Sequence, residues 1–130
     1  MIPHPTAVGL TLCDNSIIER GTNKRTTVGS FSRLAFLRFP ATAPSFFAVA
    51  TLVGGSGEGI AELILTRLDT GEELHSVRGP VRFSDRLNEV HCHSRLASLV
   101  FPAPGAYQFT LLIDGQWVAQ KRLVIARREG

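Results

Sequence analysis

The last third of the chain is the part that most constrains the fold. It contains a Pro- and Gly-rich turn at residues 101–106, an alternating apolar stretch at residues 107–113 and a second apolar stretch at residues 117–126. Asp114 and Gly115 separate the two stretches, and Asp-Gly between alternating runs is the strongest short sequence signal for a β-hairpin. The segment therefore predicts a turn, a strand, a tight hairpin and a final strand.

The rest of the chain repeats this alternation of short strands and turns. Further strands are expected at residues 8–12, 27–31, 45–53, 60–68 and 90–100, while residues 34–39 and 74–83 leave strand and loop open. No long stretch has helical periodicity. The pattern predicts an all-β fold, specifically an immunoglobulin-like antiparallel β-sandwich of about seven to nine strands, in a single domain over residues 1–130.

Four residues of the C-terminal region are expected to have structural roles. Gly105 and Tyr107 stand at the start of a predicted strand. Immunoglobulin-like domains place a Tyr near this corner, and its hydroxyl bonds to backbone a few residues upstream. Asp114 and Gly115 form the predicted hairpin turn. No catalytic role is assigned to any of the four.

The composition is that of an ordinary soluble globular protein. The chain has 130 residues, of which 44% are hydrophobic and 19% are charged, and this is enough for one buried core. The formal net charge is only +3. Nearly all the basic residues are arginine, since only Lys24 and Lys121 are lysine. A chain rich in Arg, Ala and Gly is what a GC-rich bacterial genome would encode, and we prefer this explanation to selection for a polyanionic partner.

The sequence carries no recognisable targeting signal or membrane span. Residues 1–6 have neither the positive charge nor the following apolar run and cleavage site of a secretory signal. The longest apolar run, residues 46–53, is far shorter than the ~20 residues that cross a bilayer. We expect a cytoplasmic protein of bacterial origin, in which Cys13 and Cys92 are reduced thiols.

Six short pieces occur in order along nearly the whole chain: Leu12–Asp14, Val28–Phe31, Phe39–Pro40, Gly55–Gly59, Pro104–Phe109 and Asp114–Gly115. Their order resembles a group of small uncharacterised bacterial β-sandwich proteins that form a domain family of unknown function. The resemblance implies the fold. It carries no activity and no site residues.

His91 and His93 are the residues most worth suspecting of chemistry. Residues two apart in a strand point to the same face, so both imidazoles could reach one metal ion. Zinc takes about four ligands, or three and a water, and further ligands could come from His4, Cys13, Asp14 or His75. No second Cys or His pair has the spacing of a zinc module. Two solvent-facing histidines beside a buried Cys92 are the preferred interpretation, so neither a metal nor a cofactor is assigned.

No catalytic motif is found. The glycine-rich stretch at residues 54–59 is followed by a predicted strand instead of the helix that a phosphate-binding loop requires. Ser56 does not stand in a nucleophile elbow, and the carboxylates of residues 72–73 and 85–89 lie in predicted loops with arginines nearby. We therefore expect a protein that is not an enzyme, and we identify no small-molecule substrate.

The leading functional hypothesis is a non-enzymatic module for protein interaction or self-assembly. Edge strands of a sandwich can pair with a partner strand through backbone groups. The expected edges are residues 8–12 and 123–126, and a homodimer is the simplest version. One alternative is a metal-binding protein with its site at His91 and His93. Another is weak nucleic-acid binding by arginines, which is less expected because these are scattered along the chain.

Overall fold

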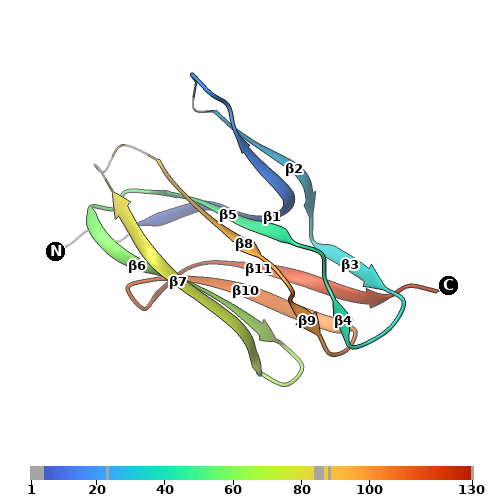
Figure 1. The fold of residues 1–130 in the computed structure, drawn as a ribbon. Helices are drawn as coiled ribbons and strands as arrows, with labels where there is room; N and C mark the ends of the chain where they lie inside the picture. The colour runs from blue at the N-terminus through green and yellow to red at the C-terminus, as the bar shows by residue number, and fades with distance from the viewer. Residues whose placement is uncertain (1–4, 23, 84–86, 88, 130) are drawn as a thin grey trace.

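The computed structural model describes residues 5–22, 24–83, 87 and 89–129, and within them the protein is built of β-strands without a helix. Figure 1 shows the arrangement of the eleven strands. They are β1 (Thr6–Ile18), β2 (Arg25–Phe31), β3 (Arg33–Phe36), β4 (Ala41–Thr42), β5 (Phe46–Val53), β6 (Gly57–Arg67), β7 (Glu73–Phe83), β8 (Val90–Leu96), β9 (Val100–Phe101), β10 (Gly105–Ile113) and β11 (Gln116–Arg127). No helix that could cross a membrane is found among the described residues.

The strands form three sheets. A four-stranded sheet has the order β2-β1-β5-β8, a five-stranded sheet has the order β3-β11-β10-β6-β7, and β4 pairs with β9. The prediction of an all-β fold is confirmed. The expected number of strands was too low, because β4 and β9 have two residues each and escape recognition by periodicity.

The larger sheet is mixed, so the prediction of a purely antiparallel arrangement was wrong. The chain leaves β2 at Phe31 and enters β3 at Arg33, which pairs in parallel with Val124 of β11. The backbone N–H of Val124 also donates to the carbonyl of Ser32 between the two strands. The chain therefore passes directly from one sheet to the other here. A parallel neighbour distant in sequence leaves no local signal.

The two larger sheets pack face to face around one apolar core. Tyr107, Phe109, Leu111 and Ile113 of β10 are all buried and alternate with partly exposed residues, as the period-two pattern predicts. From the opposite sheet, Phe46 meets Phe109 edge to face with ring centroids 6.1 Å apart. Apolar burial of this kind is the main favourable contribution to folding.

The two hairpin and corner features have defined geometry. Asp114 and Gly115 have φ values of 51° and 80° and connect β10 to β11. Two successive residues with positive φ are what a type I′ hairpin turn requires. Gly105 opens β10, and two residues later the buried Tyr107 donates its hydroxyl proton to the carbonyl of Ala103 over 2.6 Å.

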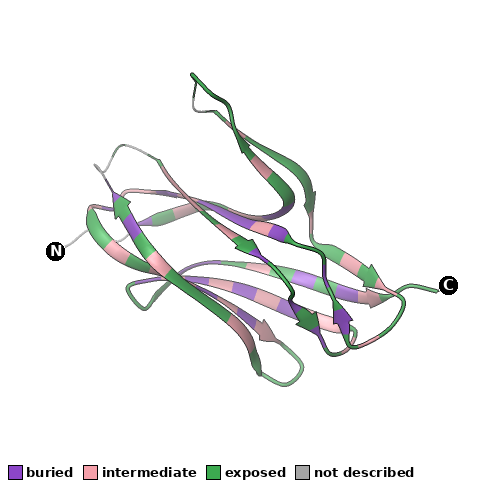
Figure 2. Cartoon of the chain, viewed as in Figure 1, coloured by how far each residue is buried: buried purple, intermediate pink, exposed green. Residues whose placement is uncertain are grey.

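The first hairpin extends beyond the sheets as an arm, which Figures 1 and 2 show as an exposed ribbon. Residues 6–13 of β1 pair with β5, and of these only Leu12 and Cys13 also pair with β2, whereas residues 15–18 pair only with residues 25–28 of β2. The arm begins where the Asp14 carboxylate lies against Gly29, which has a φ of 70°. A side chain at residue 29 would meet both an unfavourable φ and this carboxylate, so the position requires glycine.

The expected edge at residues 123–126 was wrong, because this part of β11 has β10 on one side and β3 on the other. Residues 8–12 belong to β1, where Leu12 pairs with both β2 and β5 but residues 9–11 pair with β5 alone, so this segment does have an unpaired side. The outermost strands of the two large sheets are β2 and β8 in one and β3 and β7 in the other. The chain runs directly from β2 into β3 and so connects the two sheets on that side, next to the part of β1 that pairs with β5 alone. The side bounded by β7 and β8 is open.

Candidate functional site

A crevice opens between β7 and β8 and has a volume of about 490 Å³. Its apolar lining comes from both sheets and includes Leu10, Ala48, Ala50, Ala61, Leu63 and Leu111. The crevice exists because the facing positions carry small residues. Ala50 of β5 pairs with Cys92 of β8, and on the other sheet Ala61 of β6 pairs with Gly79 of β7.

The side chains of β8 alternate between the crevice and the opposite face of the sheet. Cys92 and Ser94 pair with Ala50 and Ala48, which belong to the buried core, and they therefore face inward. His91, His93 and Arg95 are the intervening residues and alternate to the outward face, although all three also contribute atoms to the lining of the crevice. The interpretation that both histidines share one face, with Cys92 on the other, agrees with this register.

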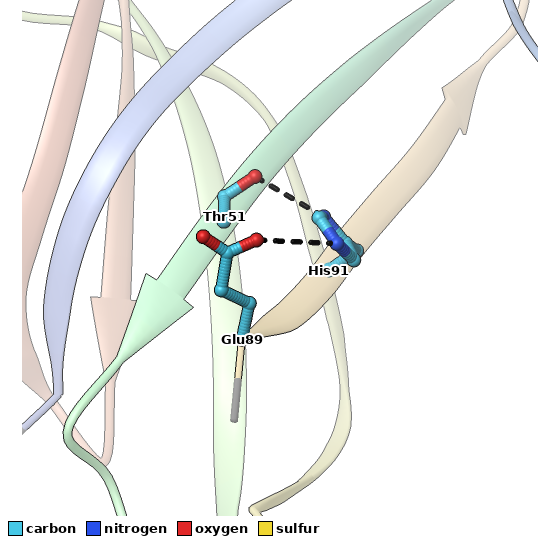
Figure 3. A network of polar contacts seen from close by, with 3 residues as sticks. All are labelled: Thr51, Glu89 and His91. Carbon is cyan, nitrogen blue, oxygen red and sulfur yellow. Dashed lines mark hydrogen bonds and ion pairs between the residues drawn. The ribbon is translucent and has the colours of Figure 1, made fainter. Parts of the chain in front are cut away.

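A polar network holds the start of β8 against β5 on the outward face (Figure 3). The Thr51 hydroxyl lies 3.1 Å from Nδ1 of His91, directly across the strand pair. Nε2 of His91 lies 3.8 Å from Oε2 of Glu89. With its proton on Nε2, the ring accepts a hydrogen bond from Thr51 and directs its N–H toward Glu89.

Hydroxyl, imidazole and carboxylate occur here in the order of a nucleophile, a base and an orienting acid. His91 is among the residues that line the crevice, but Thr51 is not, because it alternates with the inward residues Ala50 and Leu52 and so lies on the outward face. The separation of 3.8 Å between His91 and Glu89 also exceeds hydrogen-bond length. The geometry supports a positioning role for the network.

The structure does not support the metal site considered for His91 and His93. Within the described residues, no three His, Cys, Asp or Glu side chains come together as a group that could hold a metal ion. His91 already contacts Thr51 and Glu89. Of the further ligands considered, Cys13 is fully buried in β1, and His4 lies outside the described residues.

Both cysteines are free thiols. Burial raises the pKa of the Cys92 thiol, and the positive charge of Arg25 opposes this increase. Burial also raises the pKa of Cys13, the negative charge of Asp14 adds to the increase, and a hydrogen bond with the backbone of Asn15 reduces it. Cys92 therefore faces the crevice as a neutral, weakly polar group.

The basic residues are distributed over separate elements. Arg20, Lys24 and Arg25 lie at and near the tip of the β1–β2 arm. Other basic residues lie on β7, β8 and β11. The Arg78 guanidinium lies 3.9 Å from the Glu62 carboxylate, and that of Arg95 donates to the Ser45 hydroxyl over 3.2 Å. Asp85, one of the carboxylates considered above, lies outside the described residues.

Comparison with known families gives a match that covers the whole crevice. A family model matches residues 9–126, which is most of the chain. The chain belongs to DUF6941, a family of unknown function. The DUF6941 match includes all the residues that line the crevice, from Leu10 to Leu111. No curated protein matches the chain.

Sequence reasoning did not find the crevice. The small residues that leave space for the crevice are visible in the sequence. They are Ala48 and Ala50 in the most apolar strand, and Gly79 in residues 74–83, for which the sequence left strand and loop open. Small residues in a strand do not indicate a cavity by themselves, because a large residue on the facing sheet can fill the space. Only the pairing of the strands shows that small residues face one another here.

Proposed function

We propose that this protein is a non-enzymatic interaction module that binds a partner segment in extended conformation along β8. The added strand would lie beside β8 and cover the mouth of the crevice. Edge strands present unpaired backbone N–H and C=O groups, and these bind another strand largely independently of its sequence. Side chains that enter neighbouring spaces then supply specificity.

The observation that carries this proposal is the position of a free strand edge beside an apolar crevice. β8 pairs with β5 over seven residues in unbroken register and has no other neighbour among the described strands. Its sequence contains no proline. The facing edge, β7, carries Pro80, which lacks a backbone N–H and is a known protection of edge strands. β8 is therefore the edge better suited to accept a strand.

Covering the crevice would also bury apolar surface that is accessible in the single chain. Val77 of β7 faces the crevice and remains 38% exposed. Alternate side chains of an added strand would point into the space above Ala48 and Ala50. Burial of apolar surface contributes about 25 cal/mol per Å², so a few such side chains would add several kcal/mol to the backbone pairing.

The proposal includes an immunoglobulin-like sandwich as the scaffold. Two sheets packed on one core and the Tyr107 hydroxyl bonded to Ala103 support this assignment. In such a scaffold the two packed sheets fix the position of the edge strand β8 relative to the crevice. A binding site on rigid strands loses little conformational entropy when the partner arrives.

Ser94→Lys tests the proposal. An inward-pointing lysine on an edge strand is a natural device against strand addition, and in the single chain the side chain can extend through the open mouth to water. Thr27→Lys places the same change on β2, the other edge of the same sheet. Peptides selected by phage display should bind the wild-type chain and Thr27→Lys and lose binding to Ser94→Lys.

The chain should be immobilised at low density, which keeps copies apart. Amide hydrogen exchange should then show that bound peptide protects residues 90–96. If no selected peptide depends on residue 94, or if protection appears elsewhere, the proposal is wrong.

A further inference from the structure

We infer that the partner at β8 is a second copy of this chain, paired antiparallel through β8 about a twofold axis at Cys92. The inference rests on the proposed function and specifies its partner. A twofold interface uses the same surface on both copies, so β8 must be complementary to itself. The charges on β8 and beside it meet this requirement in one register.

The register follows from the position of Arg95. About a twofold axis at Cys92, Arg95 faces Glu89 of the second copy, and His91 faces His93. An axis at His93 would place Arg95 opposite His91, and an axis at Ser94 would place it opposite His93. Opposite charges directly across two strands stabilise the pair, and like charges destabilise it. Of the described residues that flank β8 closely, Glu89 is the acidic one, so charge selects the axis at Cys92.

Glu89 and Arg95 are both placed to make this contact. The Glu89 side chain is 57% exposed and lies beside the ring of His91, which limits where the carboxylate can go. Arg95 is exposed, and its described hydrogen bond is to the neutral hydroxyl of Ser45. Symmetry produces the pair twice, once at each end of the joined strands.

The same register also closes the crevice. When the twofold axis passes through Cys92, each inward-facing residue of one β8 strand lies opposite an inward-facing residue of the other. Val90 therefore faces Ser94 of the second copy, and both side chains remain on the crevice side. Joining the two β8 strands would extend the four-stranded sheet to eight strands. An axis perpendicular to this sheet brings the five-stranded sheets of both copies to the same side, with their β7 edges toward each other. The two crevice mouths then meet, and exposed Val77 is covered in both copies.

A charge exchange tests the register. Analytical ultracentrifugation and native mass spectrometry should show a dimer of the 14.1 kDa chain. Arg95→Glu and Glu89→Arg should each raise the dissociation constant by about tenfold or more, because each places like charges opposite one another. The double variant Glu89→Arg/Arg95→Glu should restore the dimer. Arg33→Glu, on the edge strand β3 of the other sheet, is the control and should leave association unchanged.

Cys92 gives a second, covalent readout. Directly opposed residues in an antiparallel pair have Cα atoms about 4.5–5.5 Å apart, which is within disulfide range. Oxidation by oxidised glutathione should join two chains through Cys92 by thiol–disulfide exchange, with release of reduced glutathione. Cys92→Ser should prevent this product, whereas Cys13→Ser should not, since Cys13 is buried.

The outcomes separate this inference from the proposed function. A chain that is monomeric at all concentrations, and still binds peptides along β8, overturns the second copy as partner and leaves the interaction module in place. A dimer that the double variant does not restore, or that Cys92 does not cross-link, overturns this register. Loss of both dimer and β8-dependent peptide binding overturns the inference and the proposed function together.

Discussion

Replacement of Tyr107 by Phe tests how much the corner at the start of β10 contributes to stability. The hydroxyl donates to the carbonyl of Ala103 over 2.6 Å, and the backbone N–H of Ala103 lies 3.4 Å from the same oxygen. Tyr107 has no accessible surface, and its ring meets that of Phe101 edge to face with centroids 5.0 Å apart. The substitution removes the hydroxyl and keeps the ring.

The expected loss in the free energy of unfolding depends on the Ala103 carbonyl, which the substitution leaves without its hydrogen-bond donor. Loss of one partner of a buried hydrogen bond costs about 1–3 kcal/mol, because the other group stays unpaired. Ala103 is only partly buried, so water can reach its backbone and the cost should fall in the lower part of this range, about 1–2 kcal/mol. For a chain of this size the melting temperature should fall by about 3–8 °C.

Urea unfolding followed by tryptophan fluorescence or circular dichroism measures this change. The midpoint should fall by about 0.5–1 M with an unchanged slope. Tyr107→Leu is the matched comparison and should cost about 1 kcal/mol more, because it also removes the ring contact with Phe101. A loss below about 0.5 kcal/mol for Tyr107→Phe would refute the reasoning, since it would mean that Ala103 finds other partners without cost.

Further predictions concern the arm and the thiols. Gly29→Ala should lower the free energy of unfolding by about 1–3 kcal/mol in urea titrations, because of its positive φ and the adjacent Asp14 carboxylate. Gly9→Ala, where nothing lies within 4 Å, should have a much smaller effect. The raised pKa of Cys13 means that the folded chain keeps a proton that the unfolded chain loses. Stability should therefore be complete below the pKa of the unfolded thiol and decrease as the pH rises through it. Unfolding at about pH 7 and about pH 10 should show this decrease, and Cys13→Ala should reduce the difference between the two. If the pH dependence is the same without Cys13, burial of this thiol is not its cause.

The sequence predicted those elements whose signals depend only on residues close together in the chain. The Asp114–Gly115 turn and the alternation of residues 107–113 depend on neighbours in sequence, and both occur where expected. The pairing of His91 and His93 on one face follows from the period of a strand. These features require no knowledge of the partner strand, because backbone geometry alone decides them.

Features that depend on which strands pair with each other could not be predicted from local sequence. Residues 123–126 were expected at an edge, yet this part of β11 lies between β10 and β3. An apolar strand has the same composition at an edge and in the middle of a sheet. Likewise, the parallel contact of β3 with β11 joins segments that are far apart in the chain, since Arg33 pairs with Val124. No local propensity encodes such a contact.

The candidate site illustrates the same division. The sequence identified His91 and His93 as residues of interest, and the structure shows His91 in a network with Thr51 and Glu89. The metal hypothesis requires a third ligand from another element, and within the described residues none is brought near. The crevice was missed because a cavity depends on the sum of side-chain volumes across two sheets.

By itself, the sequence determined that this protein is all-β, that it ends in a tight hairpin, and which residues of β8 and β10 share a face. Backbone stereochemistry and the hydrophobic pattern act over a few residues, so these properties are written locally. Only the tertiary structure decided which strands lie at the edges and where small residues face one another. Both depend on the order of strands in the sheets, and that order is set by the whole core packing at once.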